Sequence, residues 1–196
     1  MIEDCTALIL AGGESQRMGQ DKASLLFSGK TLLEKVASVL QPLFSNILVS
    51  TREPRPDCAL PQVSDHPAHK GPLAGLTAGL EQTGTSWVFA VGCDMPFIVP
   101  ALVEYLAELR DGYDAVVPVV SNHPQPMAAF YSRRSLDTLH DLMSDGASHS
   151  MREFLDRISV HYVDEAKLKT RDPILQSFFD LDTPQDIALA HNMRSL

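Results

Sequence analysis

The sequence predicts an α/β fold in which a mostly parallel central sheet is flanked by helices. Apolar runs of strand length alternate along the chain with segments of helical periodicity. This alternation is typical of parallel sheets, whose neighbouring strands are connected through helices. The hydrophobic content of 44% and the charged content of 21% are those of an ordinary globular protein. A chain of 196 residues is long enough for one domain with a full core, and we expect a single domain over 1–196.

The individual elements follow from local patterns. Strands are predicted near 7–10, 46–50, 87–91, 114–119, 127–131 and 158–163. Helices are predicted near 31–43, 72–82, 99–109, 133–143, 150–156 and 184–191. Thr31 and Glu34 form a capping box at the start of the first helix. At the last helix Thr183 is the expected N-cap, and Pro184 occupies the first turn.

A glycine-rich loop directly follows the first predicted strand. Gly12 and Gly13 allow a sharp turn that brings backbone N–H groups close to an anion, and Arg17 and Lys22 add two cations. The spacing matches neither the P-loop nor the dinucleotide-binding fingerprint. We therefore predict a loop that holds the phosphates of a nucleoside triphosphate.

Asp94 follows the apolar run 87–91, so it lies at the carboxyl end of a predicted strand. Ligands of open α/β sheets bind at this edge. The alternative is that Asp94 caps the helix predicted from residue 99. The proline-containing segment 52–70 leads toward the same edge, either as a cover that opens and closes or as a rigid connection.

Composition excludes several classes of protein. The net charge of −9 argues against a nucleic-acid-binding protein, whose phosphate contacts need a basic face. No apolar stretch approaches the roughly 20 residues that span a bilayer, and the acidic start 1–4 is unlike a signal peptide. Cys5, Cys58 and Cys93 are odd in number and widely spaced, which favours a reduced, cytoplasmic protein without a disulfide framework.

The order L-A-G-G-x-S-x-R-M-G-x-D-K at 10–22 resembles the signature of the molybdenum cofactor guanylyltransferases, the family of molybdopterin-guanine dinucleotide biosynthesis protein A. The resemblance implies a Rossmann-like, GT-A-like nucleotidyltransferase fold. It also implies transfer of GMP from GTP to the phosphate of molybdopterin, with Mg²⁺ as cofactor and pyrophosphate as product.

Site residues are carried over from matching motifs. The sequence C-D-x-P at 93–96 resembles the family motif whose aspartate binds Mg²⁺, and G-P-L-A-G at 71–75 matches a second motif. The resemblance implies Arg17, Lys22 and Asp94 as catalytic residues and Asp94 as the metal ligand. The nucleotide-binding residues implied are Leu10, Ala11, Gly12, Gly13, Lys22, Ser50, Asp65 and Asp94. The acceptor-binding residues implied are Gly75, Asp180 and Asp182.

The chain departs from the family at two places. Ser50 stands where guanylyltransferases usually carry Asn, and Asp180 and Asp182 stand in an N-x-N-T-P motif that here reads D-x-D-T-P. The form D-x-D-T-P is more like that of cytidylyltransferases and sugar-phosphate nucleotidyltransferases. The alternative is therefore a related nucleotidyltransferase that uses CTP or a sugar-phosphate acceptor. The two carboxylates either add a metal ligand opposite Asp94 or cap the last helix.

The second half of the chain is expected to bind the acceptor, and the first half the nucleotide. His123 and Arg152 lie in segments that resemble acceptor-side motifs, although an exposed hairpin and a solvated helix explain them equally well. A monomer or weak oligomer is expected, with handover of the cofactor to other biosynthesis proteins or molybdoenzymes. A non-catalytic nucleotide sensor or cofactor carrier is the more distant alternative.

Overall fold

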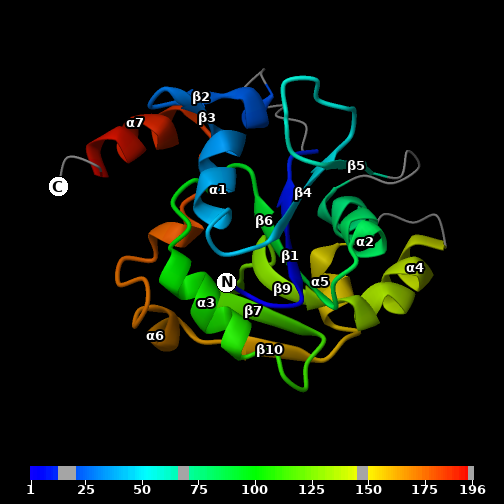
Figure 1. Cartoon of the computed structure of the whole chain (residues 1–196). Coiled ribbons are helices and arrows are strands. Elements are labelled where there is room, and N and C mark those ends of the chain that lie inside the picture. Colours follow the sequence, from blue (N-terminus) through cyan, green and yellow to red (C-terminus); the bar gives the residue numbers. More distant parts are fainter. Residues whose placement is uncertain (13–20, 66–70, 145–149, 194–196) are drawn as a thin grey trace.

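The computed structural model describes residues 1–12, 21–65, 71–144 and 150–193. An eight-stranded sheet forms the centre of the molecule, with strand order β10-β7-β9-β6-β1-β4-β5 and β8 attached to β7 (Figure 1). The strands are β1 (Cys5–Leu10), β4 (Asn46–Thr51), β5 (Gln62–Ser64), β6 (Trp87–Gly92), β7 (Ala115–Val120), β8 (His123–Pro124), β9 (Ala128–Ser132) and β10 (Val160–Val163). The predicted α/β class is confirmed.

The sheet is mostly parallel. β1 pairs in parallel with both β4 and β6, β4 with β5, and β7 with β10. β9 is antiparallel to β6 on one side and to β7 on the other. The apolar run of β9 has no local feature that sets its direction, because strand direction depends on the connection that precedes it.

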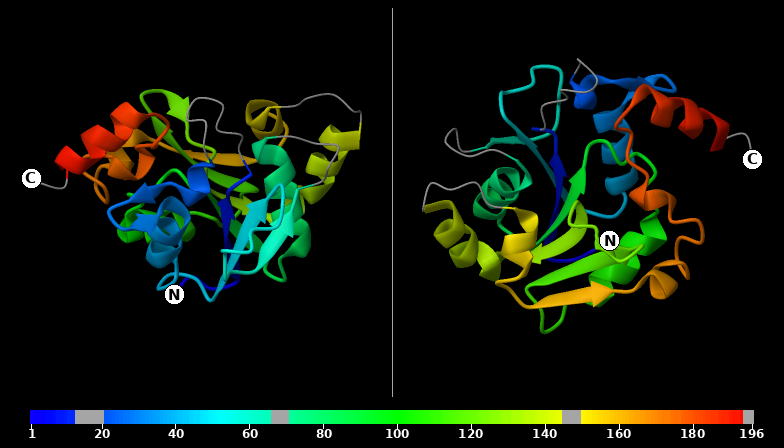
Figure 2. Two further views of the ribbon diagram at one scale, coloured as in Figure 1. Left: turned by 90° about the horizontal axis from the view of Figure 1, so that it is seen from above. Right: turned by 180° about the vertical axis from the view of Figure 1, so that it is seen from behind.

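Helices cover both faces of the sheet (Figure 2). Alternate side chains of β1 enter different cores, with Ala7 and Ile9 in one and Leu8 in the other. The helices on the first face include α1 (Leu32–Leu40) and α3 (Pro100–Glu108), and those on the second include α2 (Pro72–Gln82), α4 (Leu136–Ser144) and α5 (Met151–Leu155). Burial on both faces explains why β1 and β6 lack the alternation of apolar and polar residues that marks a half-exposed strand.

A third, smaller core joins distant parts of the chain. Phe27 and Leu32, near the hairpin of β2 (Leu26–Phe27) and β3 (Lys30–Thr31), pack with Leu181 and with Ala190 of α7 (Pro184–Met193). Figure 1 shows the hairpin and α7 side by side at one edge of the molecule. This contact brings the C-terminal segment next to the short helix η1 (Lys22–Ser24).

Most predicted elements are present, with boundaries that differ by a few residues. Predicted helix 31–43 ends at Leu40, and predicted helix 133–143 is divided into η2 (Arg133–Ser135) and α4. The prediction missed the hairpin, β5, β8, η1, α6 (Glu165–Leu168) and η3 (Gln176–Phe178), which are too short for a periodic pattern. Within the described residues, no helix has the length and apolar character that crossing a membrane requires.

Candidate active site

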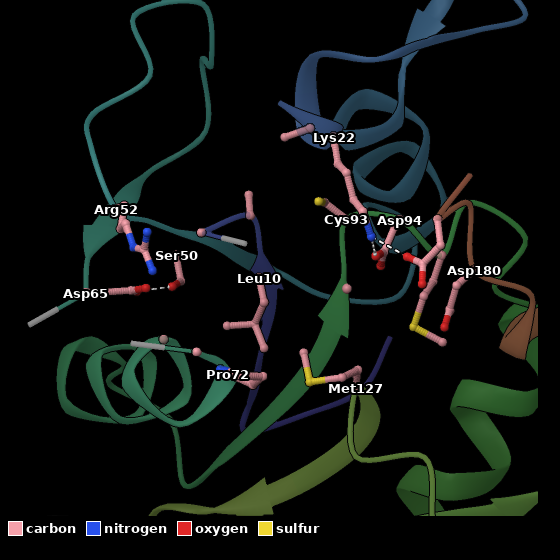
Figure 3. Close-up of a pocket in the computed structure, with 18 of the residues that line it drawn as sticks. Leu10, Lys22, Ser50, Arg52, Asp65, Pro72, Cys93, Asp94, Met127 and Asp180 are labelled. Atoms are coloured by element: carbon pink, nitrogen blue, oxygen red, sulfur yellow. Dashed lines mark hydrogen bonds and ion pairs between the residues drawn. The ribbon is translucent and has the colours of Figure 1, made fainter. Parts of the chain in front are cut away.

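A cavity of about 370 Å³ opens at the carboxyl ends of β1, β4 and β6 (Figure 3). The N-terminus of α2 points into it, since Gly71, Pro72 and Gly75 all contribute to its wall. Its other lining residues are Leu10, Ala11, Gly12, Asp21, Lys22, Ala23, Ser50, Arg52, Asp65, Gly92, Cys93, Asp94, Met95, Gln125, Pro126, Met127, Asp180 and Asp182. The described residues that the sequence assigned to catalysis, nucleotide binding and the acceptor-binding set Gly75, Asp180 and Asp182 therefore meet at one edge of the sheet.

Backbone hydrogen bonds continue past the ends of the central strands. The amide of Ala11 donates to the carbonyl of Ser50 at 2.9 Å, and the amide of Cys93 donates to the carbonyl of Leu10 at 3.2 Å. Because these bonds hold the three strand ends in register, the residues that follow them diverge from a common, fixed edge.

Lys22 lies between two carboxylates. Its Nζ is 2.8 Å from Asp94 Oδ2 and donates a second hydrogen bond to Asp182 Oδ1 (Figure 3). Partial burial works against the charged form, but the bonds to Asp182 and Asp94 and the attraction of their charges outweigh it and raise the pKa of Lys22 above its ordinary value. Lys22 is therefore a fixed positive charge at neutral pH.

The C-terminal segment brings Asp182 to this lysine. The amide of Leu181 donates to the carbonyl of Asp94 at 2.9 Å, which places the neighbouring Asp182 beside the carboxyl end of β6. The cap of α7 is made by other side chains: Thr183 Oγ1 accepts from the amide of Asp186 at 3.2 Å, and the Asp186 carboxylate accepts from the amide of Thr183 at 2.7 Å. The predicted N-cap Thr183 is confirmed, and the side chain of Asp182 is directed to Lys22 instead of capping the helix.

Asp180 lies close to the same group. The residue as a whole is exposed, yet its carboxyl group faces the cavity (Figure 3). The pKa of Asp180 is raised to about 7, mainly by loss of hydration and to a smaller extent by the negative charges of Asp94 and Asp182. The cluster thus has more negative charge than Lys22 alone neutralises.

On the opposite side of the cavity, Ser50 and Asp65 form a polar pair. Ser50 Oγ donates to Asp65 Oδ1 (Figure 3). A Cβ atom added at Gly75 would lie 2.5 Å from Ser50 Oγ and 2.6 Å from Leu10 Cδ2, and one at Gly12 would lie 2.8 Å from Asp65 Oδ2. The two glycines allow this close approach, and Gly75, predicted to bind the acceptor, lies beside the predicted nucleotide-binding residues.

The carboxylates suit a divalent cation. Asp94 and Asp182 both reach the point that the ammonium group of Lys22 occupies, and Mg²⁺ prefers such oxygen ligands. In the described part of the chain no group of three or more His, Cys, Asp or Glu side chains is arranged to hold a metal. A magnesium ion here would take its remaining ligands from water and phosphate oxygens, as it usually does. The N-cap of α3 is Val99, so the alternative role of Asp94 as a helix cap is wrong.

Some predicted residues are not placed in the cavity. Gly13 and Arg17 lie outside the described residues. His123 is exposed in β8, and Arg152 is exposed on α5; neither lines the cavity. Cys93 lines it, but burial raises the pKa of its thiol to about 12, so the thiol stays protonated and is a poor nucleophile.

The sequence interpretation missed several lining residues, among them Asp21, Arg52, Gln125 and Met127. Arg52 lies beside Asp65 and Ser50 in Figure 3. Its position directly after a strand that ends at the ligand-binding edge was a usable signal. Gln125 and Met127 belong to the segment that was singled out for His123, but the loop turns these residues inward instead.

A comparison with protein families matches residues 7–162 of the chain to the MobA-like NTP transferase domain. The chain belongs to the MobA-like nucleotidyltransferase family. A relative from Pelotomaculum thermopropionicum, named "Probable molybdenum cofactor guanylyltransferase", is 35% identical over 96% of this chain and 92% of its own length. The predicted family is confirmed, and the chain is a nucleotidyltransferase.

Solved structures agree with this membership in the MobA-like family. Molybdopterin-guanine dinucleotide biosynthesis protein A from Archaeoglobus fulgidus superposes with a TM-score of 0.86 at 28% identity, covering 97% of this chain and 98% of that one. The 2-C-methyl-D-erythritol 4-phosphate cytidylyltransferase of Thermus thermophilus superposes with a TM-score of 0.72 at 19% identity, covering 97% and 98%. The second likeness shows that the fold is shared and carries no information about the base.

Proposed function

We propose that this protein transfers GMP from GTP to the phosphate of molybdopterin, which releases pyrophosphate and forms molybdopterin guanine dinucleotide. The names of its MobA-like relatives support this reaction. The structural observation that carries it is the convergence of Lys22, Asp94 and Asp182 at the edge of the sheet where nucleotides bind.

The residues support a reaction driven by positioning and charge neutralisation. The acceptor phosphate is ionised at neutral pH and can attack the α-phosphorus without a general base. Lys22, the loop glycines Gly12 and Gly13, and Arg17 would neutralise the triphosphate and the leaving pyrophosphate. Asp94 and Asp182 would hold Mg²⁺, which would supply positive charge to offset the charge of the reacting phosphates. Asp180 would then face the acceptor side of the same centre.

Asp65 and Ser50 are the proposed base-reading pair. Guanine presents N–H donors at N1 and at its exocyclic amino group, and a carboxylate supplies matching acceptors. The Ser50 hydroxyl donates to Asp65 Oδ1, and the two oxygens of a carboxylate together have about four lone pairs that can accept. We expect this pair to favour GTP over CTP, although Ser50 is shorter than the asparagine usual at this position.

Isothermal titration with GTP, CTP and ATP, each with Mg²⁺, tests the base assignment. We expect a GTP preference of at least tenfold, about 1.4 kcal/mol, that disappears in Asp65→Ala. The matched control is Asp111→Ala, which removes an exposed carboxylate outside the cavity. A CTP preference in the wild type would instead assign the chain to cytidyl transfer.

Metal binding is tested without turnover. Titration with Mn²⁺ in the presence of GTP, followed by electron paramagnetic resonance, should show weaker binding in Asp94→Asn and Asp182→Asn. Asp111→Asn should bind as the wild type does. Unchanged Mn²⁺ affinity in both cavity variants would contradict the proposed metal site.

A reduced, cytoplasmic setting, a monomeric or weakly oligomeric state, and handover of the product to other proteins remain proposals. All three cysteines are free thiols, which supports the first of these.

A further inference from the structure

The loop between β4 and β5 contains one arginine that is nearly buried. The side chain of Arg55 is only 12% exposed, although its neighbours Glu53, Pro54, Pro56 and Asp57 are exposed. Arg55 does not line the cavity. Its burial therefore needs an explanation other than direct contact with a ligand.

Arg55 holds the short helix that carries Lys22. Its Nη1 donates to Asp21 Oδ2, and its Nη2 donates to Ser24 Oγ. Asp21 is the N-cap of η1, and its Oδ1 accepts from the amide of Ala23 at 3.1 Å. Ser24 is the last residue of the helix. One guanidinium group thus binds both ends of the helix whose first residue is Lys22.

The backbone of Arg55 is anchored to the sheet. The amide of Arg55 donates to Gln62 Oε1 at 2.8 Å, and Gln62 Nε2 donates back to the carbonyl of Arg55 at 2.9 Å. Gln62 belongs to β5 and pairs with Val49 of β4. Because Gln62 holds both the amide and the carbonyl of Arg55, the backbone of Arg55 has a defined position relative to β5.

The helix η1 cannot define its own position. It has three residues, and its internal bonds are those of a single turn, from the amide of Ser24 to the carbonyl of Asp21 and from the amide of Leu25 to the carbonyl of Lys22. One turn is unstable in isolation, so contacts with the rest of the protein must hold it. Figures 1 and 2 show the loop after β4 standing beside this segment.

We propose that Arg55 is a positioning residue that holds η1 so that the ammonium group of Lys22 reaches Asp94 and Asp182. The loop from Arg52 to Gln62 then acts as a fixed brace, which favours the rigid alternative for this part of the segment 52–70. A guanidinium suits the task because its planar fork binds two acceptors in fixed directions, whereas a lysine ammonium does not. The consequence for catalysis rests on the proposed function, in which Lys22 neutralises the triphosphate.

The placement of Lys22 is tested first without any reaction. Acylation of lysines in the nucleotide-free protein, quantified by peptide mass spectrometry, should be at least fivefold faster at Lys22 in Arg55→Met than in the wild type. A lysine released from its carboxylate partners loses its proton more easily and is less shielded. The exposed Lys30 serves as internal control, and Arg134→Met removes a guanidinium that binds Asp114 and the carbonyl of Tyr113 instead.

Arg55→Lys is the second variant, for the case in which Arg55→Met does not fold. It keeps the charge but loses the fork, so we expect an intermediate labelling rate at Lys22. Wild-type labelling of Lys22 in the folded variants would overturn the proposal.

A double-mutant cycle then links the brace to catalysis. Arg55→Met should lower kcat at least tenfold with a smaller change in KM, and it should have no further effect in a Lys22→Met background. Additive effects would mean that Arg55 does not act through Lys22, which overturns the proposal. A wild type that binds no nucleotide would overturn the proposed function, whereas the labelling result would still decide the structural role of Arg55.

Discussion

The central sheet has an amino edge, where its parallel strands begin, and a carboxyl edge, where they end. These two edges differ in how their polar groups are satisfied. At the amino edge, Thr83 donates to Thr6 at 2.7 Å, the hydroxyls of Thr6 and Thr85 are 2.9 Å apart, and Thr85 donates to the carbonyl of Trp87 at 2.9 Å. At the carboxyl edge, Asp94 and Asp182 converge on Lys22. The first group is neutral and closed, and the second is charged.

The chemistry of the side chains explains this difference. A hydroxyl both donates and accepts, so hydroxyls can satisfy one another, whereas two ionised carboxylates only accept and need a donor between them, here the ammonium group of Lys22. A hollow of about 740 Å³ lies at the amino edge, larger than the cavity of about 370 Å³ at the carboxyl edge. Of the described residues that line the larger hollow, none is charged. Converging charge, and not volume, distinguishes the candidate site from the hollow at the amino edge.

The largest effect is expected from removing the cation at the carboxyl edge. Lys22→Met should lower the turnover of GTP by about 10²- to 10³-fold, because a fixed charge that acts on the leaving group stabilises the transition state more than bound substrate. Pyrophosphate release measures turnover, and titration with GTP measures affinity. Lys167→Met, at an exposed ion pair with Asp164, is the control. Equal losses in affinity and in rate would contradict this role.

Two glycines of α2 lie in different surroundings within one helix. A Cβ at Gly75 would meet Ser50 and Leu10 at the carboxyl edge, and one at Gly79 would meet Leu8, with Cδ1 at 2.8 Å, in the core. Gly75→Ala and Gly79→Ala should each cost about 1–3 kcal/mol of unfolding free energy, because both sites are overpacked. Urea unfolding measures this cost.

Nucleotide binding should separate these two variants. Only Gly75→Ala should weaken GTP binding, by about tenfold or 1.4 kcal/mol, because only its methyl group displaces Ser50 and Asp65. The same loss of affinity in Gly79→Ala would show that binding follows general stability instead of local geometry.

At the amino edge, Thr83→Val should lower stability and leave catalysis unchanged. Thr83 is 5% exposed, and its loss leaves the hydroxyls of Thr6 and Thr85 with fewer partners, at a cost of about 1–3 kcal/mol. Thr83→Ser keeps the hydroxyl and should lose less. Urea unfolding and kcat/KM are measured on both, and a fall in kcat/KM for Thr83→Val would mean that the two edges are coupled.

The smallest effect concerns the pH dependence of stability, because Asp180 is exposed and solvent screens its charge. The folded-state pKa of Asp180 is about 7, above its ordinary 3.8, so its ionisation disfavours the folded state increasingly from pH 4 to pH 7. In metal-free buffer, Asp180→Asn should therefore gain stability relative to the wild type as the pH rises through this range.

Asp186 provides the opposite sign. Its hydrogen bonds with Thr183 lower its pKa, so its contribution to stability is lost as the pH falls through this lowered pKa. Thermal unfolding of Asp180→Asn and Asp186→Asn across pH 3–8 should show slopes of opposite sign relative to the wild type. A stability curve of Asp180→Asn that runs parallel to the wild-type curve would mean that the Asp180 carboxyl group titrates normally.

Much of the fold could be predicted because its signals are local. The uninterrupted apolar runs of β1 and β6 predict buried strands, and Thr31 with Glu34 predicts the start of α1, whose capping box is present. The short strand β5 and the direction of β9 escaped prediction. Three residues are too few for a periodic signal, and direction is a property of the chain path.

Local sequence patterns indicate several groups of the candidate site and the strand ends at which they lie. Gly12 follows β1, Ser50 ends β4, and Asp94 follows β6, so each is placed by its distance from an apolar run. Such positions depend on neighbours within a few residues, which is why a linear pattern reveals them.

Which of these groups meet depends on the packing of the whole chain. Asp182 reaches Lys22 across 160 positions of sequence because the amide of Leu181 bonds to the carbonyl of Asp94 and because Leu181 and α7 pack with the β2–β3 hairpin. Arg55 reaches Asp21 across 34 positions through a loop that has no regular structure. Ion pairs between distant residues depend on how the whole chain closes around its cores, and no local pattern encodes that closure.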